Sequence, residues 1–234
     1  MQGLDIVGFI QQLPIYLIPG LFAITVHEVA HGWVAKRCGD PTALFAGRLT
    51  LNPFKHIDPI GTVAVPLGLL LMTGGRLAFG WAKPVPVAFG NLRNPRRDMI
   101  LVAAAGPASN LLMAFGWAAI GGVTLATLGF DTLVGDWLIG MSVFGININV
   151  ILAVFNMLPL PPLDGGRVLA GLLPPRASRV LDGIEPYGFM IVLLLMFIPA
   201  QTFGLPGGGG VLWVILEPLR FYFTDFFWAV AGFG

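Results

Sequence analysis

Long apolar runs are the feature that most restricts how this chain can fold. A helix needs about 20 apolar residues to cross the hydrocarbon core of a bilayer. Five runs reach that length or come near it, at about 13–36, 99–128, 137–158, 187–203 and 210–231. Charged residues make up only 11% of the sequence, and the mean hydropathy is +0.83, far from the average of soluble proteins. We therefore predict an all-α integral membrane protein that crosses the lipid bilayer several times.

A sixth apolar run, at about 60–75, is short and contains Pro66. Basic residues lie on both sides of it, at 36–55 and at 76–97. Because Lys and Arg in short loops mark the cytoplasmic side of a membrane, both flanking loops are expected on that side. The run is therefore predicted to be a re-entrant or short helix. The alternative is a full crossing, which would place one strongly basic loop outside.

The loops between the later runs alternate in charge. The loop before residue 137 contains Asp131 and Asp136 but no basic residue. The stretch after residue 158 contains three arginines, Arg167, Arg176 and Arg179. This alternation predicts a multi-pass protein whose first and third long runs both end on the cytosolic side. We expect the membrane to be a prokaryotic-type cell membrane. With a net charge of +1 and basic residues confined to short loops, we expect no nucleic-acid partner.

One pair of histidines lies inside the first apolar run, in the sequence His27-Glu28-Val29-Ala30-His31. Residues four apart share one face of a helix, so both imidazoles can bind one ion. In zinc peptidases with this pattern, the glutamate after the first histidine is the general base that activates water. Ionisable groups in a membrane are costly unless they have a function. We therefore expect one Zn²⁺ per chain, although hydrogen bonds from both histidines to neighbouring helices are the structural alternative.

The third zinc ligand is expected from the stretch 156–167, NMLPLPPLDGGR, which follows the third long run. Catalytic zinc sites usually have three protein ligands, and a carboxylate oxygen is an accepted third donor. Asp164 fits this role because prolines fix the backbone before it and glycines allow a tight turn after it. In the alternative interpretation Asp164 only caps a helix that starts near Gly166. His56 or Asp58 would then be the rival third ligand.

A further motif, Ala105-Gly106-Pro107-Ala108-Ser109-Asn110, lies between these two. The three motifs, in this order, resemble the site-2 protease family of intramembrane zinc metalloproteases. Residues 47–62 and 79–87 resemble the compact branch of that family, and no stretch looks like the PDZ or CBS domains of other branches. His27, His31 and Asp164 match the zinc ligands of the family, and Glu28 matches its catalytic glutamate.

The resemblance also implies a domain organisation, a single transmembrane peptidase domain over residues 1–234. Its catalytic core would contain the HExxH helix, the GPxxN helix and the helix that leads to the NxxPxPPLDGG loop. This core is expected at about 20–37 and 98–167, with accessory helices at about 187–203 and 210–231.

Several other polar residues are candidates for the site. Asn156 matches the motif asparagine of the family, so we predict that it holds the substrate backbone or donates to the oxyanion. Asn110 is a second candidate for substrate binding, with simple helix packing as the alternative. Ser142 and Asn149 are expected to join helices. His56 is expected to brace a loop, and a gating or inhibitory contact with zinc is the alternative.

Residues 83–87, Lys-Pro-Val-Pro-Val, cannot form a helix because of their alternating prolines. Such a segment suits an extended edge beside which a substrate could pair as an added strand. A plain loop is the equal alternative.

Together these features predict an intramembrane zinc endopeptidase that cleaves transmembrane segments of membrane proteins, as in regulated intramembrane proteolysis. The substrate helix must first unwind, because a helical backbone holds its carbonyls in its own hydrogen bonds. One alternative is a non-enzymatic zinc-binding membrane protein or transporter, which has no need of the base Glu28 and would line its spans with more charge. Another is a peptidase that acts on soluble peptides at the inner membrane surface.

Overall fold

The computed structural model describes residues 6–72, 80–205 and 210–233. Within these ranges the chain is helical and has no β-strand, so the predicted all-α class is confirmed. The α-helices are α1 (Ile6–Arg37), α2 (Thr42–Phe45), α3 (Val65–Met72), α4 (Pro95–Thr127), α5 (Leu133–Asn156), α6 (Asp164–Leu172), α7 (Pro175–Phe197) and α8 (Val211–Ala231). Four of the described helices are long and apolar enough to cross a membrane: α1 from Gln12 on, α4, α5 and α7.

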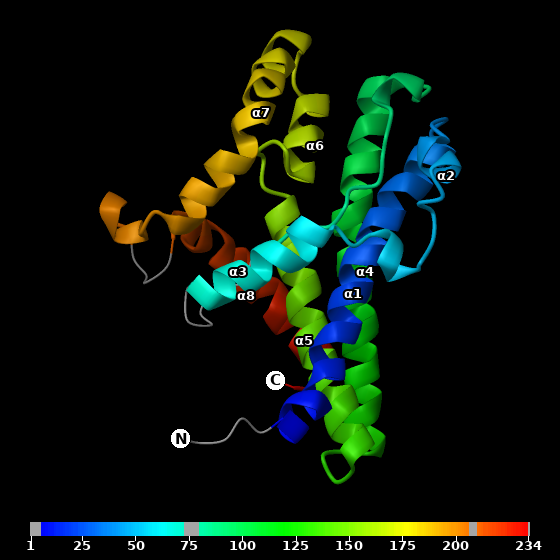
Figure 1. Cartoon of the computed structure of the whole chain (residues 1–234), viewed down its shortest axis with the longest axis vertical. Coiled ribbons are helices and arrows are strands. Elements are labelled where there is room, and N and C mark those ends of the chain that lie inside the picture. The colour runs from blue at the N-terminus through cyan, green and yellow to red at the C-terminus, as the bar shows by residue number, and fades with distance from the viewer. Residues whose placement is uncertain (1–5, 73–79, 206–209, 234) are drawn as a thin grey trace.

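Helices α1, α4 and α5 pack side by side and form the centre of the molecule (Figure 1). Glycines allow their backbones to approach closely: a Cβ on Gly145 of α5 would lie 2.5 Å from the indole ring of Trp117 of α4. A Cβ on Gly121 of α4 would lie 2.9 Å from the Cβ of Ser142 of α5. Small residues at such contacts are typical of membrane helices, which associate through van der Waals packing. The three predicted runs that carry the motifs therefore lie together in one bundle.

Helix α7 differs in its bounds from the predicted run at 187–203. It begins twelve residues earlier, at Pro175, where proline suits the first helical position, and it ends at Phe197. Its first turns contain charged residues such as Arg176 and Arg179, so a search for apolar runs misses them. Pro199 follows the end of the helix, and residues 200–203 form a separate 3₁₀ turn.

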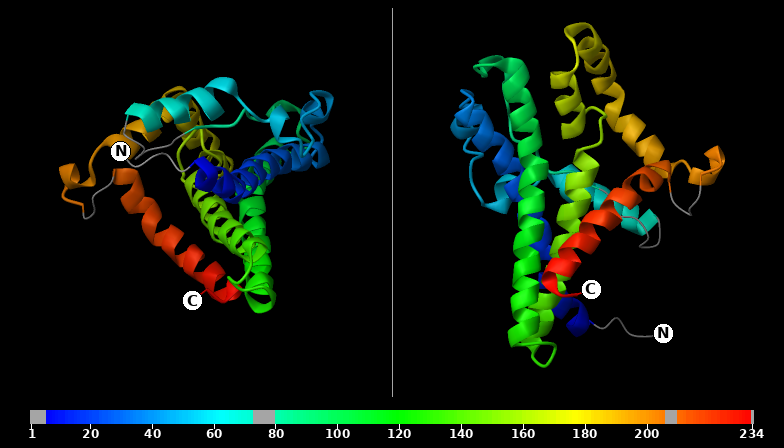
Figure 2. Two further views of the ribbon diagram at one scale, coloured as in Figure 1. Left: turned by 60° about the horizontal axis from the view of Figure 1, so that its bottom comes forward. Right: turned by 180° about the vertical axis from the view of Figure 1, so that it is seen from behind.

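Helix α8 occupies the predicted run at 210–231, packs on α4 and α5, and runs obliquely across them (Figure 2). It is not among the four apolar helices of the described chain, because it carries Glu217, Arg220 and Asp225. The guanidinium Nε of Arg220 donates to the Glu217 carboxylate at 2.9 Å, one turn away on the same helix. Pairing lowers the cost of placing these two charges near lipid.

The segment around α3 returns to its starting point. A π-helical turn at Pro59–Ala64 leads into α3, which lies across the central bundle (Figure 1). After α3, the backbone N–H of Trp81 donates to the Gly61 carbonyl at 3.0 Å, and the Thr62 hydroxyl donates to the backbone carbonyl of Trp81 at 2.8 Å. Entry and exit of this segment therefore lie side by side, as the predicted re-entrant segment requires and a full crossing does not.

Candidate metal centre

Three side chains from distant parts of the chain converge at the centre of the molecule. The Nε2 atoms of His27 and His31 lie 3.0 Å apart on α1. The Oδ2 atom of Asp164 lies 3.2 Å from the His27 Nε2 and 3.3 Å from the His31 Nε2. Among the described residues, these three form a group whose ligand atoms could hold one metal ion. The structure thus brings the three predicted zinc ligands together.

Glycines after Asp164 allow the chain to deliver it to the histidines. Asp164 is the first residue of α6 and follows the loop 157–163. A Cβ on Gly165 would lie 2.3 Å from the Met157 carbonyl oxygen, and one on Gly166 would lie 2.4 Å from the Pro161 nitrogen. Because any side chain at these two positions would collide with backbone, only glycine fits. Asp164 is therefore the first residue of the helix and not its N-cap, which is Leu163, so the capping interpretation is wrong, and the Asp164 carboxylate reaches the histidines instead.

Gly106 of α4 leaves space beside both imidazoles. A Cβ built on Gly106 would lie 2.4 Å from the Nε2 of His31 and 2.6 Å from the Nε2 of His27. The third sequence motif, AGPASN, thus brings the backbone of α4 against the metal-binding face of α1. An alanine at this position would occupy the space next to the two nitrogen atoms.

The second nitrogen of each imidazole is hydrogen-bonded to an oxygen on α4. The Nδ1 of His27 lies 2.5 Å from the Oδ1 of Asn110, and the Nδ1 of His31 lies 2.7 Å from the Val102 carbonyl. With a carbonyl oxygen as partner, each Nδ1 carries the proton, so each Nε2 presents a lone pair to the shared space. This arrangement fixes both the tautomer and the ring orientation.

Asn110 is fully buried and has all of its polar groups engaged. Its Nδ2 donates to the Ala23 carbonyl at 3.2 Å and to the Oδ1 of Asn149 at 2.8 Å. Asn149 in turn donates to the Gly145 carbonyl of its own helix at 2.8 Å. A chain of amides thus connects α5 through α4 to His27. These contacts place Asn110 behind the imidazole of His27, and Asn110 is not itself among the residues that line the pocket.

The donor set fits a zinc ion. The Oδ2 of Asp164 is buried and has no hydrogen-bond donor among the described residues. It faces the lone pairs of two imidazoles, so three electron-pair donors meet without a proton between them. Such an arrangement is unfavourable unless a cation neutralises it, and two histidine nitrogens with one carboxylate oxygen form a known catalytic zinc set. A fourth position remains for water or substrate in sites of this kind.

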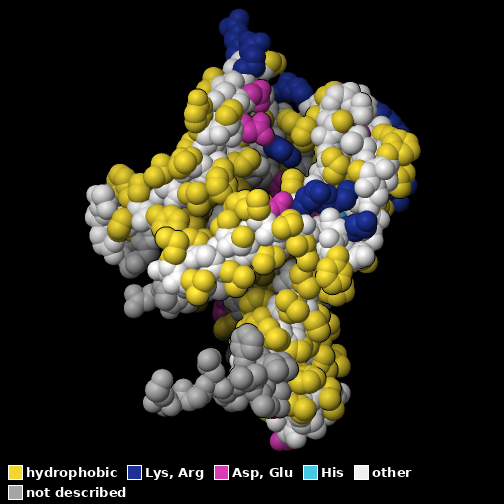
Figure 3. All heavy atoms as spheres, in the orientation of Figure 1, with side chains coloured by type: hydrophobic (Ala, Val, Ile, Leu, Met, Phe, Trp, Pro, Cys, Tyr) yellow, Lys and Arg dark blue, Asp and Glu magenta, His cyan; other side chains and the backbone are white. Residues whose placement is uncertain are grey.

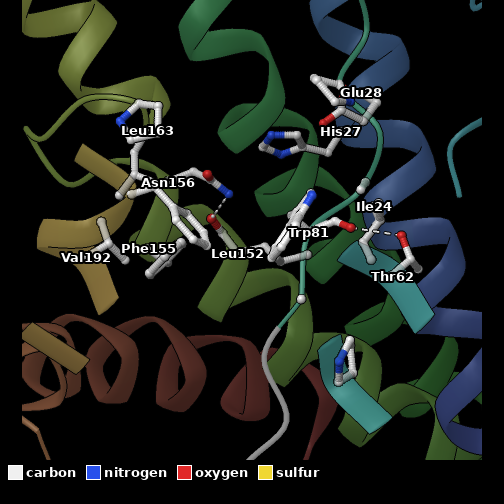
Figure 4. Close-up of a pocket in the computed structure, with 16 residues that line it drawn as sticks. Ile24, His27, Glu28, Thr62, Trp81, Leu152, Phe155, Asn156, Leu163 and Val192 are labelled. Atoms are coloured by element: carbon white, nitrogen blue, oxygen red, sulfur yellow. Dashed lines mark hydrogen bonds between the residues drawn. The ribbon is translucent and has the colours of Figure 1, made fainter. Parts of the chain in front are cut away.

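A cavity of about 650 Å³ lies beside this group and is lined by His27, Glu28 and Asn156 together with mostly apolar side chains (Figure 4). His27 and Glu28 come from α1, whereas Asn156 comes from the end of α5. The Nδ2 of Asn156 donates to the Leu152 carbonyl at 3.0 Å, so only one of its two amide hydrogens is used there. The apolar walls include Trp81, Phe155, Leu163 and Phe189.

The carboxylate of Glu28 is held by backbone. Its Oε2 accepts a hydrogen bond of 2.7 Å from the N–H of Val85. Within the described part of the chain, no hydrogen bond to its other oxygen occurs. Val85 belongs to the predicted extended segment 83–87, which is non-helical in the structure and runs along the cavity.

The two rival ligands have structural roles and lie outside the three-residue group. His56 is 2% exposed, and its Nε2 lies 2.9 Å from the Thr50 carbonyl, as expected of a loop-bracing residue. Asp58 caps the helical turn that precedes α3 by accepting from the N–H groups of Ile60 and Gly61, at 3.0 and 2.7 Å.

Three contacts of the site could not be predicted from the sequence, those made by Val102, Asn149 and Val85. Two of them act through backbone groups, which every residue carries, so no residue type signals them. Asn149 was recognised as polar and helix-joining, but its specific partner Asn110 depends on the rotation of α4 against α5.

A His-His-Asp group beside a glutamate and a cavity, with both histidines on a helix long enough to span a bilayer, defines the class of multi-pass membrane proteins with a peptidase-type metal site. Comparison with known proteins supports this assignment. Residues 131–198 match the model of peptidase family M50. The putative zinc metalloprotease YwhC of Bacillus subtilis is 39% identical over 212 residues, which cover 89% of this chain and 88% of YwhC. The chain therefore belongs to peptidase family M50.

Other relatives carry the same description. The putative zinc metalloprotease Rip2 of Mycolicibacterium smegmatis is 33% identical over 180 residues, which cover 77% of this chain and 65% of Rip2. The putative zinc metalloprotease MJ0611 of Methanocaldococcus jannaschii is 41% identical over 68 residues, 29% of this chain and 31% of MJ0611. No solved structure matches the chain significantly. The protein is thus a membrane zinc metalloprotease, and the group formed by His27, His31 and Asp164 is positioned for Zn²⁺.

Proposed function

We propose that the protein is an intramembrane endopeptidase that hydrolyses peptide bonds in transmembrane segments of other membrane proteins, in regulated intramembrane proteolysis. The observation that carries this proposal is the position of Glu28. It lies next to the metal group, on the wall of an apolar cavity of about 650 Å³, within a helix long enough to span the membrane. A base in this place suits the hydrolysis of an apolar peptide, whereas a site that only stores or transports metal does not need one.

In the proposed mechanism, His27, His31 and Asp164 hold the zinc ion, and Asn110 positions His27. When bound, Zn²⁺ supplies a Lewis acid for a peptide carbonyl and for water. Glu28 accepts a proton from the attacking water while the water oxygen bonds to the carbonyl carbon. It then delivers this proton to the nitrogen of the leaving amine as the carbon–nitrogen bond breaks.

We assign a substrate-binding and oxyanion-stabilising role to Asn156. It lines the same cavity as Glu28 but projects from α5, on the side opposite α1 (Figure 4). An amide hydrogen that α5 does not use can donate to a carbonyl oxygen of the substrate, where negative charge develops. For Asn110 we propose positioning rather than substrate contact, because its amide is buried and already used by His27, Ala23 and Asn149.

We further propose that the site opens toward the cytosol of a prokaryotic-type cell. Lys and Arg side chains gather in the upper half of the face in Figure 3, while the lower half of that face is largely hydrophobic. Asp131 lies in the loop that joins α4 to α5, and Asp136 lies in the first turn of α5. The positive-inside rule then assigns the basic end to the cytosol. We also propose that residues 1–234 act as one peptidase domain.

The proposal is tested with purified protein in proteoliposomes and a labelled transmembrane peptide. We expect wild type to cleave the peptide, and Glu28→Gln to retain zinc but lose cleavage by about 1,000-fold or more, since an amide cannot accept the proton. Cleavage by Glu28→Gln at the wild-type rate would contradict the assigned mechanism. If wild type cleaves soluble peptides but leaves the transmembrane peptide intact, the substrate class is wrong.

A further inference from the structure

Residues 80–88, here called the strap, run along the cavity and are fixed by hydrogen bonds on both sides of Val85. Before Val85, the Lys83 N–H donates to the His56 carbonyl at 2.9 Å, and the guanidinium of Arg48 donates to the Lys83 carbonyl at 2.7 Å. After it, the Ala88 N–H donates to the Asp40 carboxylate at 2.7 Å. The strap is therefore a braced segment of the fold.

Val85 lies between these anchors and against α1. Its side chain is only 7% exposed, and its Cγ1 would lie 2.9 Å from a Cβ built on Gly32 of that helix. Gly32 stands one helical turn after Glu28, so the Val85 side chain and N–H contact neighbouring positions of the same helix face. This close packing holds the Val85 backbone at a fixed distance from Glu28.

The neighbours of Val85 restrict it further. Pro84 and Pro86 have fixed φ angles and no N–H, so the Val85 N–H is the single backbone donor of residues 84–86. This one donor is directed at the Oε2 of Glu28, at 2.7 Å. A backbone N–H that donates to a carboxylate makes a strong hydrogen bond, and it does so here without the entropy loss of a flexible side-chain donor.

A glutamate side chain has several rotatable bonds, so a catalytic glutamate needs a partner that fixes its carboxylate. We propose that the peptide N–H of Val85 is the positioning group of the catalytic base: it holds the Oε2 of Glu28 so that the other oxygen faces the reacting water. This inference rests on the proposed function. It also assigns a role to the Pro-Val-Pro sequence, which presents one rigid donor to one acceptor.

The test replaces the peptide bond before Val85 by an ester, through incorporation of the α-hydroxy acid analogue of valine. This change removes the N–H and keeps the side chain. The matched control is the same replacement at Val87, whose N–H makes no hydrogen bond within the described residues and which also follows a proline. Cleavage of the transmembrane peptide is measured for both, with zinc content as a second readout.

We expect the ester at residue 85 to lower kcat by about 10- to 100-fold, since a small displacement of a catalytic group has effects of this size. KM should stay within about twofold and zinc content should be unchanged, because neither substrate contacts nor ligands are altered. The ester at residue 87 should behave like wild type.

If the variant with the ester at residue 85 has the kcat of wild type, the inference is overturned. A change in KM alone would also overturn it, because the Val85 N–H would then only hold the cavity wall. An equal loss of kcat in the variant with the ester at residue 87 would overturn it as well. These outcomes differ from failure of the proposed function, which would appear as absent cleavage by wild type or as full cleavage by Glu28→Gln. As an independent check, binding of the peptide to Glu28→Gln should be unaffected by the ester at residue 85.

Discussion

Gly106 is the residue of α4 that leaves room for the metal centre. The lone pairs of His27, His31 and Asp164 converge on one small space, and the missing side chain of Gly106 keeps the adjacent volume open. We expect Gly106→Ala to fold but to lose most of its zinc, because its Cβ would lie 2.4 Å from the Nε2 of His31. The measurement is zinc per chain by elemental analysis after dialysis.

Gly116 is the matched control for this substitution. It lies on the same helix, α4, and a Cβ built there would meet no atom within 4 Å. Gly116→Ala should therefore bind zinc as wild type does. Equal zinc content in the two alanine variants would show that the space beside the imidazoles is not needed for the metal.

At the level of single residues, the sequence was sufficient for the side chains that carry chemistry and insufficient for the groups that orient them. His27, His31 and Asp164 were predicted to converge, and in the structure they do. Asn110 was predicted to bind substrate or to pack between helices, and its hydrogen bond to His27 was not foreseen because it depends on how α4 is rotated toward α1. No residue type marks the Val85 N–H as the partner of Glu28, because every residue except proline has a backbone N–H.

At the scale of elements, a buried carboxylate just after α1 binds the last residue of the strap, Ala88, and Asn91 beyond it. Asp40 is fully buried and accepts from the Thr42 N–H at 3.1 Å, the Asn91 amide at 3.0 Å and the Ala88 N–H at 2.7 Å. We expect Asp40→Asn to lower the free energy of unfolding by about 1–3 kcal/mol, since the amide has one acceptor oxygen and leaves a buried donor unsatisfied. Thermal unfolding in detergent measures this loss, and the exposed Asp131→Asn is the control.

The same contact predicts a pH dependence. Burial raises the pKa of Asp40, but the hydrogen bonds from Thr42, Asn91 and Ala88 outweigh it and hold the pKa below its usual value. A carboxylate with a lowered pKa stabilises the fold above its unfolded pKa, and this contribution disappears as the pH falls through the folded pKa. The difference in Tm between wild type and Asp40→Asn should therefore shrink below about pH 4. A difference that stays constant down to about pH 3 would contradict this origin.

Hydrophobic patterning found the elements that are apolar throughout, and it missed those that begin in polar residues. The runs at 13–36, 99–128 and 137–158 correspond to α1, α4 and α5, which pack on one another. Helix α7 starts at Pro175 with a charged stretch, so its first three turns were read as loop. The return of the segment after α3 to Gly61 is a tertiary contact, and only the charge of its flanking loops indicated it.

At the scale of the whole molecule, the lower half of the face in Figure 3 is largely hydrophobic, and the metal group lies beside a cavity with mostly apolar walls. A transmembrane substrate must present an extended peptide there, and its helical hydrogen bonds oppose this. We expect a Gly-Pro pair near the cleavage site of a transmembrane peptide to raise kcat/KM by about tenfold, since proline costs a helix about 3 kcal/mol. Rates are compared in proteoliposomes, with an Ala-Leu pair as the control. Equal rates for the two peptides would mean that unwinding of the substrate is not required.

The most direct test of the account is the zinc content of purified wild type beside Asp164→Asn, measured with Asp131→Asn as a control at a distant carboxylate. Residue 164 lies more than a hundred positions from the histidines in sequence, yet its carboxylate lies 3.2 and 3.3 Å from their Nε2 atoms. We predict about one zinc per chain in wild type and in Asp131→Asn, and a loss of most zinc in Asp164→Asn, which lacks the anionic oxygen donor. Full zinc content in Asp164→Asn would contradict the proposed metal centre and leave the third ligand unassigned.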